Sequence, residues 1–385
     1  MIKREAQSEI LSLATQFKAV AIVGPRQSGK TTLSKALFPE KAYVNFENPD
    51  IRLFAMEDPR GFLSNYPHGA IFDEAQRVPE IFSYLQQILD ESNTNGLFVI
   101  TGSNNFLLQE SISQSLAGRV GYLNLLTLTI GEIGQKTADV NTLIHKGGYP
   151  ALYHDPVEPN KWYANYIRTY IERDVRLIKN ISNITLFERF LRLCAGRVCQ
   201  LLNMNSLAIE VGVDSKTIHA WLGVLESSFV AFRLQPYHKN FNKRVVKMPK
   251  LYFYDTGLVA ALLGIENPRQ LDLSVYKGPL FENLIVVDLI KTRFNQAKPN
   301  NLFFWRDNAG HELDLIVERE NRLIPVEIKS GQTVTSAFFK GLRYWQKLTQ
   351  ADQGYVVYAG NSLQKRSDGM TIVPYHDLEP VQALL

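Results

Sequence analysis

Residues 20–32 of the chain read VAIVGPRQSGKTT and decide how its first part folds. An apolar run of β type is followed by a turn containing Gly24 and Gly29, and then by a stretch that favours helix. The glycines let the backbone bend so that its N–H groups point at a phosphate, and the start of the helix adds to the attraction. Lys30 supplies a mobile charge for the β- and γ-phosphates, and the Thr31 hydroxyl is suited to ligate Mg²⁺. The stretch therefore predicts a phosphate-binding loop.

A second motif, residues 69–74 (GAIFDE), indicates a short buried strand that ends in two acids. Asp73 beside the loop would hold Mg²⁺ directly or through water, and Glu74 would polarise an attacking water. The alternative is a strand end that carries two solvated acids. The phosphate loop some forty residues upstream favours the catalytic interpretation.

A third strand is expected at residues 97–101, where the chain continues into a polar turn. Polar side chains at the carboxyl end of a parallel strand lie where α/β sheets bind ligands, so Ser103 or Asn104 would sense the γ-phosphate or orient water. Turn chemistry alone also selects these residues. Arg119 is a candidate for neutralising transition-state charge in cis or in a neighbouring subunit, with a surface salt bridge as the alternative. The expected catalytic residues are Lys30, Glu74, Asn104 and Arg119. The expected contacts to ATP are Gly24, Pro25, Arg26, Gln27, Ser28, Gly29, Lys30, Thr31, Thr32, Asp73 and Ser103, with Thr31 and Asp73 on Mg²⁺.

These segments resemble those of the AAA-type P-loop ATPases of bacteria and archaea that carry an uncharacterised C-terminal domain. The resemblance rests on GPRQSGKTT (24–32), AIFDEAQRVPE (70–80), FVITGSNNFLL (98–108) and SLAGR (115–119). It implies a parallel five-stranded sheet in which the Walker B strand is separated from the P-loop strand, and an ATPase that uses Asp73 and Glu74. The segments GGYP (147–150), YIERD (170–174) and PKLYFYDTGL (249–258) look like signatures of the uncharacterised domain and extend the resemblance over most of the chain.

Length and composition limit the class of protein. A chain of 385 residues suggests two or three domains, and 45% hydrophobic with 21% charged residues is typical of a globular protein with more than one core. The only cysteines are Cys194 and Cys199, which excludes a disulfide framework and favours the cytoplasm. No apolar run reaches the ~18 residues of a membrane helix, and the charged N-terminus does not resemble a cleaved signal peptide. We expect an ATPase domain over 1–135, a helical connector and winged helix over 136–270, and a nuclease-like domain over 271–385.

Basic charge is concentrated in the middle of the chain, where residues 160–250 contain 15 Lys and Arg against 6 Asp and Glu. Residues 204–254 have the order helix, turn, helix, strand, basic loop, strand, which is typical of a winged helix. Such a module would place Lys216, Thr217 and His219 in a major groove of DNA, and would place Lys243, Arg244 and Lys247 of the loop on phosphates. Winged helices also bind proteins, and that alternative stays open.

The last region contains a second group of acids and a lysine. A helix beginning near Gly278 carries Glu282, one strand carries Asp314, and the next strand carries Glu327 and Lys329 on one face. This pattern resembles the core of PD-(D/E)XK nucleases, with Asp314 and Glu327 as ligands of a second Mg²⁺ or Mn²⁺. An inactive scaffold that has kept the acids is the alternative.

Together the patterns predict an α/β chain: a P-loop NTPase sheet, a helical and winged-helix region, and a restriction-endonuclease-like α/β domain. The expected function is Mg²⁺-dependent ATP hydrolysis coupled to DNA binding by the C-terminal half. The alternative is a nucleotide-gated scaffold that binds protein partners through the winged helix, hydrolyses ATP slowly and carries an inactive nuclease-like fold. A protein partner or a second copy of the chain is a further candidate partner. No membrane partner is expected.

Overall fold

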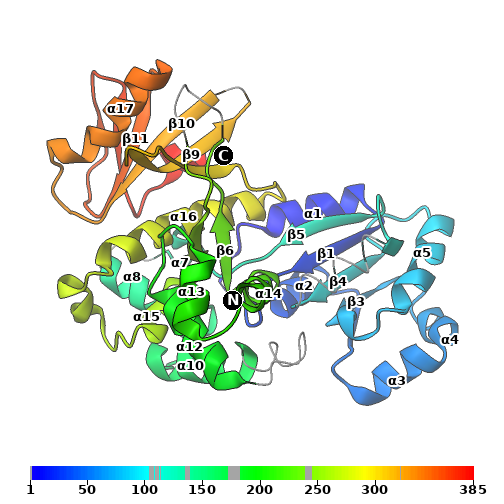
Figure 1. Ribbon diagram of the computed structural model, residues 1–385. Coiled ribbons are helices and arrows are strands. Elements are labelled where there is room, and N and C mark those ends of the chain that lie inside the picture. Colours follow the sequence, from blue (N-terminus) through cyan, green and yellow to red (C-terminus); the bar gives the residue numbers. More distant parts are fainter. Residues whose placement is uncertain are drawn as a thin grey trace. The chain divides into compact units, whose positions relative to one another are not determined.

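The computed structural model describes residues 2–103, 108, 112, 114–134, 139–171, 183–238, 245–320 and 322–385, except the side chains of residues 170 and 171 (Figure 1). The chain forms two compact units. The first comprises Met1–Leu128, Ser227–Phe229 and Arg293–Lys298, and the second comprises Thr129–Glu226, Val230–Thr292 and Pro299–Leu385. Each unit is described by itself.

The first unit is built on a parallel sheet, drawn blue to cyan in Figure 1. Its described elements, in chain order, are α1 (Gln7–Gln16), β1 (Ala19–Val23), α2 (Lys30–Leu37), β2 (Ala42–Asn45), α3 (Pro49–Glu57), α4 (Pro59–Ser64), β3 (Ala70–Asp73), η1 (Ala75–Arg77), α5 (Ile81–Glu91), β4 (Phe98–Gly102) and β5 (Val120–Asn124).

Strands β1, β3 and β4 are buried along their whole length, because their sequences AVAIV, AIFD and FVITG are apolar on both faces. Runs of this kind form parallel sheets that are covered on both sides. Among the described residues the sheet has five strands in the order β2-β3-β4-β1-β5. Strand β3, with its terminal acids, is therefore separated from the P-loop strand β1 by β4. This confirms the sheet that the resemblance to AAA-type ATPases implied.

The second unit begins with helices and a small hairpin. Its first described elements are α7 (Ile130–Ile133), α8 (Val140–Lys146), α9 (Ala151–His154), α10 (Pro159–Tyr166), η2 (Ile167–Ile171), α12 (Ile184–Ala195), α13 (Met204–Val211), α14 (Ser215–Ser227), β6 (Ala231–Leu234), β7 (Lys250–Phe253), α15 (Thr256–Leu262) and η3 (Pro268–Leu273). Gly212, with φ 88°, ends α13 in the left-handed conformation and allows the turn into α14. Strands β6 and β7 pair antiparallel. The expected order of helix, turn, helix, strand and strand is present.

Asp255 links the helices of this region. Its carboxylate accepts hydrogen bonds from the Tyr163 hydroxyl at 2.6 Å, from the Gly148 N–H at 2.8 Å and from the Leu258 N–H at 3.0 Å. Tyr163 is fully buried within a group of aromatic rings around Tyr149. One acid therefore joins α15, α10 and the turn after α8.

The C-terminal part contains a mixed sheet, drawn yellow to red in Figure 1. Its elements are α16 (Lys277–Asn295), β8 (Leu302–Arg306), β9 (Glu312–Arg319), β10 (Arg322–Lys329), η4 (Ser336–Phe339), α17 (Lys340–Thr349), β11 (Gly354–Tyr358), β12 (Gln364–Lys365), β13 (Met370–Pro374) and α18 (Glu379–Gln382). In the described residues the strand order is β12-β13-β11-β10-β9-β8. Strand β10 pairs antiparallel with β9 and parallel with β11. The expected C-terminal α/β domain is present, and its core includes the buried Trp305 and Trp345.

None of the helices in the described part of the chain combines the length and the apolar character that crossing a bilayer requires.

Candidate functional site

The loop between β1 and α2 has the backbone that a phosphate cradle requires. Gly29 has φ 93° and Gln27 has φ 64°, so two residues of this short loop are left-handed. A Cβ at Gly24 would lie 2.0 Å from the Leu125 carbonyl oxygen, so only glycine fits there. Helix α2 begins at Lys30, immediately after the loop. Backbone N–H groups and a helix start therefore converge, as the sequence predicts.

Lys30 is 5% exposed. Its ammonium group donates to the carbonyl oxygens of Gly24 at 3.0 Å and Pro25 at 2.7 Å. The amine is thus held against the loop itself. To bind a phosphate, it has to exchange these carbonyl oxygens for phosphate oxygens.

Arg4 supports the same loop from a position that the sequence gave no reason to consider. The side chain is buried, and its two terminal nitrogens donate at 2.8 Å each to the carbonyl oxygens of Ser28 and Leu126. A planar guanidinium suits two such acceptors. Arg4 therefore ties the loop to the segment that follows β5.

Asp73 at the end of β3 is bonded to hydroxyl groups from three elements. Thr31 Oγ1 donates to Asp73 Oδ2 at 2.8 Å, and the Tyr43 hydroxyl donates to the same oxygen at 2.7 Å. Thr101 Oγ1 donates to Asp73 Oδ1. Burial, followed by the bond to Asp73, raises the pKa of Tyr43, so its hydroxyl stays protonated and donates. Tyr43 and Thr101 had no motif to indicate them.

The fit of Mg²⁺ is tested by the distance between its two expected ligands. The Thr31 hydroxyl and the Asp73 carboxylate lie 2.8 Å apart, so one ion can contact both or reach the acid through a water. A hydroxyl and a carboxylate are the oxygen donors that Mg²⁺ prefers. The residues present therefore fit the ion.

Glu74 occupies a strained position. Its φ is 56°, in the left-handed region where a non-glycine residue is uncommon. Glu74 Oε2 accepts from Gln76 Nε2 at 2.6 Å and from Ser103 Oγ at 3.0 Å. The structure thus brings Ser103 to Glu74, while Gln76 is a contact that the sequence did not single out. Asn104 lies outside the described residues.

Arg119 lies at the amino-terminal ends of the parallel strands β1 and β5, whereas the phosphate loop lies at the carboxyl end of β1. Its proposed role in cis is therefore wrong. Arg119 directly precedes β5, whose first residue, Val120, pairs with Ala19 at the start of β1; the phosphate loop follows the other end of β1. A strand of five residues extends ~16 Å, which separates Arg119 from the loop. Its guanidinium forms a two-contact ion pair with Asp90, at 2.5 and 2.9 Å. This is the surface salt bridge that was the alternative.

The C-terminal acids and lysine lie close together. Lys329 Nζ donates to Asp314 Oδ2 at 3.0 Å and to Glu327 Oε2, and Asp314 Oδ2 also accepts from the Ile328 N–H at 2.8 Å. Burial, and then the negative charge of Asp314, raise the pKa of Glu327 well above its usual value. Asp314 and Glu327 share a side-chain hydrogen bond, which fits a protonated Glu327.

Glu282 on α16 has different partners. Glu282 Oε1 accepts from the Tyr252 hydroxyl at 2.5 Å and is paired with Lys250 Nζ at 3.2 Å. Lys250 and Tyr252 belong to β7, and nothing in the sequence pattern indicated them. Over the residues that the structure covers, no group of three or more His, Cys, Asp and Glu side chains is arranged to hold a metal ion.

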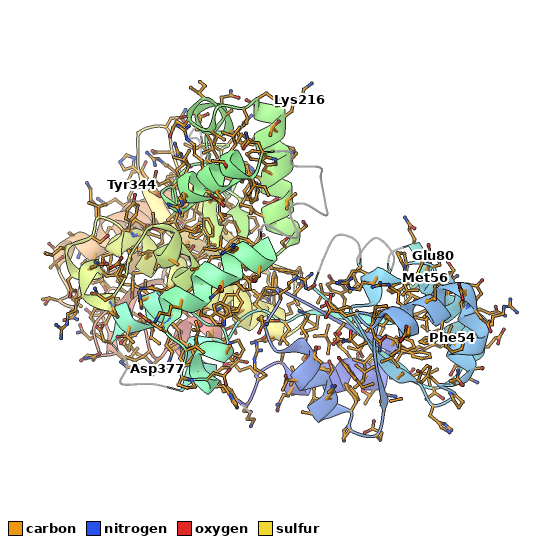
Figure 2. All side chains as sticks on the ribbon, turned by 90° about the horizontal axis from the view of Figure 1, so that it is seen from below. Phe54, Met56, Glu80, Lys216, Tyr344 and Asp377 are labelled. Carbon is orange, nitrogen blue, oxygen red and sulfur yellow. The ribbon has the colours of Figure 1, made fainter. Side chains whose placement is uncertain are left out.

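The expected DNA contacts are exposed where they are described. Lys216 and His219 lie on the exposed face of α14, and Lys216 projects from the outer surface of the second unit (Figure 2). Thr217 is half-buried, and its N–H donates to Asp214 Oδ1 at 2.7 Å, which caps the helix. Lys247 is exposed. Lys243 and Arg244 are among the residues that the structure does not describe.

Comparison with known proteins gives matches along most of the chain. Residues 16–134 match a family described as "AAA domain". Residues 137–269 and 277–378 match "Domain of unknown function (DUF8612)" and "Domain of unknown function (DUF4143)". Among solved structures, the chain is similar to the Walker-type ATPase paby2304 of Pyrococcus abyssi at 15% identity, over 68% of this chain and 96% of that one, with a TM-score of 0.42.

Two relatives match nearly the whole chain. They are named uncharacterized protein Rv2008c of Mycobacterium tuberculosis and uncharacterized protein Mb2031c of Mycobacterium bovis. Each is 31% identical over 376 residues, which is 97% of this chain and 83% of the relative. The chain therefore belongs to the same family as these two mycobacterial proteins, and its first part, which matches the AAA domain family, has the parallel sheet of a P-loop NTPase.

Proposed function

We propose that the first unit binds ATP with Mg²⁺ and hydrolyses it. The observation that supports this proposal is the meeting of three chain segments at one edge of the sheet. Asp73 is hydrogen-bonded to Thr31 of the phosphate loop, and the neighbouring Glu74 is hydrogen-bonded to Ser103 at the end of β4. The carboxyl edge of a parallel sheet is where α/β proteins bind ligands.

Each residue has a separate task in this proposal. The loop N–H groups and Lys30 bind the phosphates, and Thr31 and Asp73 hold the metal ion, which neutralises charge that develops on the phosphate oxygens. Glu74 accepts the proton of the attacking water. Ser103 and Gln76 both donate to Glu74 Oε2, and in this proposal the other oxygen, Oε1, accepts the proton of the water.

The experiment is the variant Lys30→Ala, with Lys298→Ala as its control, because Lys298 is an exposed lysine of the same unit that bonds to Gln296. Loss of the Lys30 amine removes the loop's mobile charge and leaves the apolar core intact. We expect the Lys30 variant to lose Mg²⁺-ATP binding in calorimetry while the Lys298 variant keeps it. Equal ATP affinity in both variants would contradict the proposed site.

A finer proposal is that the middle region is a winged helix that binds DNA. Support comes from the net +9 of residues 160–250 and from the exposure of Lys216, His219 and Lys247. Contacts between cations and phosphates release counterions, so DNA affinity should fall steeply with salt. A titration of DNA affinity against salt concentration tests this: a steep slope supports phosphate contacts, and absence of binding at low salt contradicts them.

A second candidate function for the same region is a protein-binding scaffold that is gated by nucleotide. The observation that favours it is Ile209 on α13, an apolar side chain that is 82% exposed. Such a residue is typical of an interface anchor when a partner covers it. The scaffold predicts that DNA is not bound, that ATP turnover is slow, and that Ile209→Asp disrupts association with a second copy in light scattering.

A further proposal is that the C-terminal domain has a PD-(D/E)XK-like fold with a second metal site. The support is that Asp314, Glu327 and Lys329 lie within hydrogen-bonding distance of one another, on two neighbouring strands. Two carboxylates would need water and DNA phosphate oxygens to complete the coordination of Mg²⁺ or Mn²⁺. Metal-dependent nicking of DNA that Asp314→Ala abolishes would support this assignment.

The division into domains at 1–135, 136–270 and 271–385 and the cytoplasmic location are also proposals. Both cysteines are free thiols and buried, as in a reducing compartment. Limited proteolysis tests the division, because domain boundaries are cleaved first.

A further inference from the structure

Tyr43, in strand β2, contacts the candidate magnesium site from outside its motifs. Its hydroxyl donates to Asp73 Oδ2 at 2.7 Å. In the parallel register of β2 and β3, Asp73 pairs with Asn45, and Tyr43 lies two residues before Asn45. Side chains two residues apart on a strand share a face of the sheet, so Tyr43 and Asp73 project to the same side.

The carboxylate of Asp73 is held from both neighbouring strands, because β3 lies between β2 and β4. Tyr43 of β2 donates to Oδ2, and Thr101 of β4 donates to Oδ1. The third donor, Thr31, is itself an expected ligand of Mg²⁺. Tyr43 and Thr101 are therefore the two donors that can fix the carboxylate independently of the metal.

Helix α2 contacts Tyr43 through a second residue. Lys35 Nζ lies 3.4 Å from the centre of the Tyr43 ring, in the position of a cation–π contact. Lys35 comes four residues after Thr31, so the two side chains lie on the same face of the helix. That face reaches Asp73 directly through the Thr31 hydroxyl and indirectly through the Tyr43 ring.

Packing explains the ring of Tyr43 but not its hydroxyl group. The half-buried ring packs against the apolar core of the first unit, and a phenylalanine would fill the same space. The hydroxyl group instead bonds to an oxygen of the buried Asp73 carboxylate. Hydrogen bonds to charged groups are stronger than those between neutral groups, so this bond constrains the carboxylate.

We propose that Tyr43 is a positioning residue for Mg²⁺: its hydroxyl fixes Asp73 Oδ2 in the orientation that the metal requires, and Lys35 fixes the ring. The inference rests on the proposed function of the first unit, and it adds that strand β2 helps to set the affinity for the metal. Replacing a residue that hydrogen-bonds to a metal ligand typically lowers metal affinity or activity by about 10–100-fold. Nucleotide binding without metal does not use Asp73 and should not depend on Tyr43.

The test is the affinity of the full chain for a non-hydrolysable ATP analogue, measured by calorimetry with Mg²⁺ and again with EDTA. The ratio of the two affinities reports the contribution of the metal. Tyr43→Phe removes the hydroxyl and keeps the ring, so we expect this ratio to fall by roughly tenfold while the affinity in EDTA stays unchanged. Tyr84→Phe is the matched control, because Tyr84 lies half-buried on α5 and its hydroxyl makes no hydrogen bond within the described part of the chain.

Lys35→Met tests the contact above the ring, because it removes the charge and keeps the length of the side chain. We expect this variant to lower the same ratio by roughly two- to fivefold, which is the strength of an exposed cation–π contact. Since Lys35 acts through the Tyr43 hydroxyl, adding Lys35→Met to Tyr43→Phe should lower the ratio no further. An additional loss in the double variant would overturn this role of Lys35.

The outcomes separate this inference from the proposed function. Tyr43→Phe that keeps the wild-type ratio would overturn the role of Tyr43 and leave ATP binding with Mg²⁺ intact. A loss of equal size with Mg²⁺ and with EDTA would also overturn it, because Tyr43 would then support the fold of the nucleotide site and not the metal. Wild-type protein that binds the analogue in neither condition would contradict the proposed function itself, and this inference with it.

Discussion

At the scale of single residues, Arg4 shows how a side chain outside the motifs supports the nucleotide site. Its guanidinium donates one buried hydrogen bond to the carbonyl oxygen of Ser28 and one to that of Leu126. Buried carbonyls that lose their donors cost ~1–3 kcal/mol each. Arg4 therefore helps to hold the phosphate loop in its shape.

We predict that Arg4→Met lowers the affinity for Mg²⁺-ATP by roughly tenfold, because the loop is no longer held in its cradle shape. Arg4→Lys should fall between this variant and the wild type, since one ammonium group cannot reproduce the planar fork. Calorimetric ATP titration of the folded variants measures the effect. Wild-type affinity in a folded Arg4→Met would show that the contact does not support the loop.

His145 makes a pH-dependent contribution to stability. It is buried on α8, and its Nε2 lies 3.1 Å from Asn160 Oδ1. Burial lowers the pKa of His145 below its usual value, an effect that outweighs the hydrogen bonds that would raise it. The unfolded chain therefore takes up its proton at a higher pH than the folded chain does.

It follows that the stabilisation due to neutral His145 is complete above about pH 6.5 and is lost as the pH falls through the lowered pKa. We predict that the free energy of unfolding of the wild type falls more between about pH 7.5 and 5.5 than that of His145→Gln. Urea titrations of both proteins at these pH values provide the comparison. Parallel losses in the two proteins would exclude this role.

At the scale of elements, the loop between β6 and β7 provides the clearest test of DNA binding. We predict that replacing Lys243, Arg244 and Lys247 together by Glu weakens DNA binding and makes the slope of log affinity against log salt shallower by about 2–3. ATP affinity should stay unchanged, because none of these residues belongs to the phosphate loop. Fluorescence anisotropy with labelled duplex DNA measures both quantities. Unchanged DNA affinity would favour the protein-binding scaffold.

Local patterns made part of the site predictable from the sequence. The loop residues Gly24 to Thr32 are consecutive in the chain, and so are the acids Asp73 and Glu74. The local conformation of each group could therefore be predicted from its own short motif. The position of Ser103 near the acids was predictable, because it directly follows β4, which pairs parallel with β3. Its role on the γ-phosphate stays a prediction. The role of Arg119 in cis was misjudged, because a turn sequence does not show at which ends of the parallel strands the turn lies.

Other members of the site depend on tertiary structure. Tyr43, Gln76 and Arg4 reach the loop and its acids through side chains that no short motif contains. Lys250 could be read only as one more basic residue of the middle region, since its acid partners lie more than thirty residues away. Such contacts follow from packing, which spacing along the chain does not reveal.

At the scale of the whole molecule, the chain combines a P-loop unit that matches the AAA domain family with a second unit that contains a helical region, a hairpin and a mixed sheet. The first unit also presents apolar side chains: Leu53, Phe54 and Met56 of α3 are exposed, and Figure 2 labels Phe54 and Met56. We infer for this unit that Glu74 acts on the attacking water while other residues bind the nucleotide.

The most direct measurement compares ATP turnover with ATP binding in Glu74→Gln. Glutamine keeps the size of the side chain but cannot accept the proton, so we predict normal Mg²⁺-ATP affinity and a turnover that is lower by roughly 10²–10⁴-fold. Glu80→Gln is the control, because Glu80 lies exposed at the start of α5. Full turnover in Glu74→Gln would contradict the role of Glu74 as the base that accepts the proton of the water.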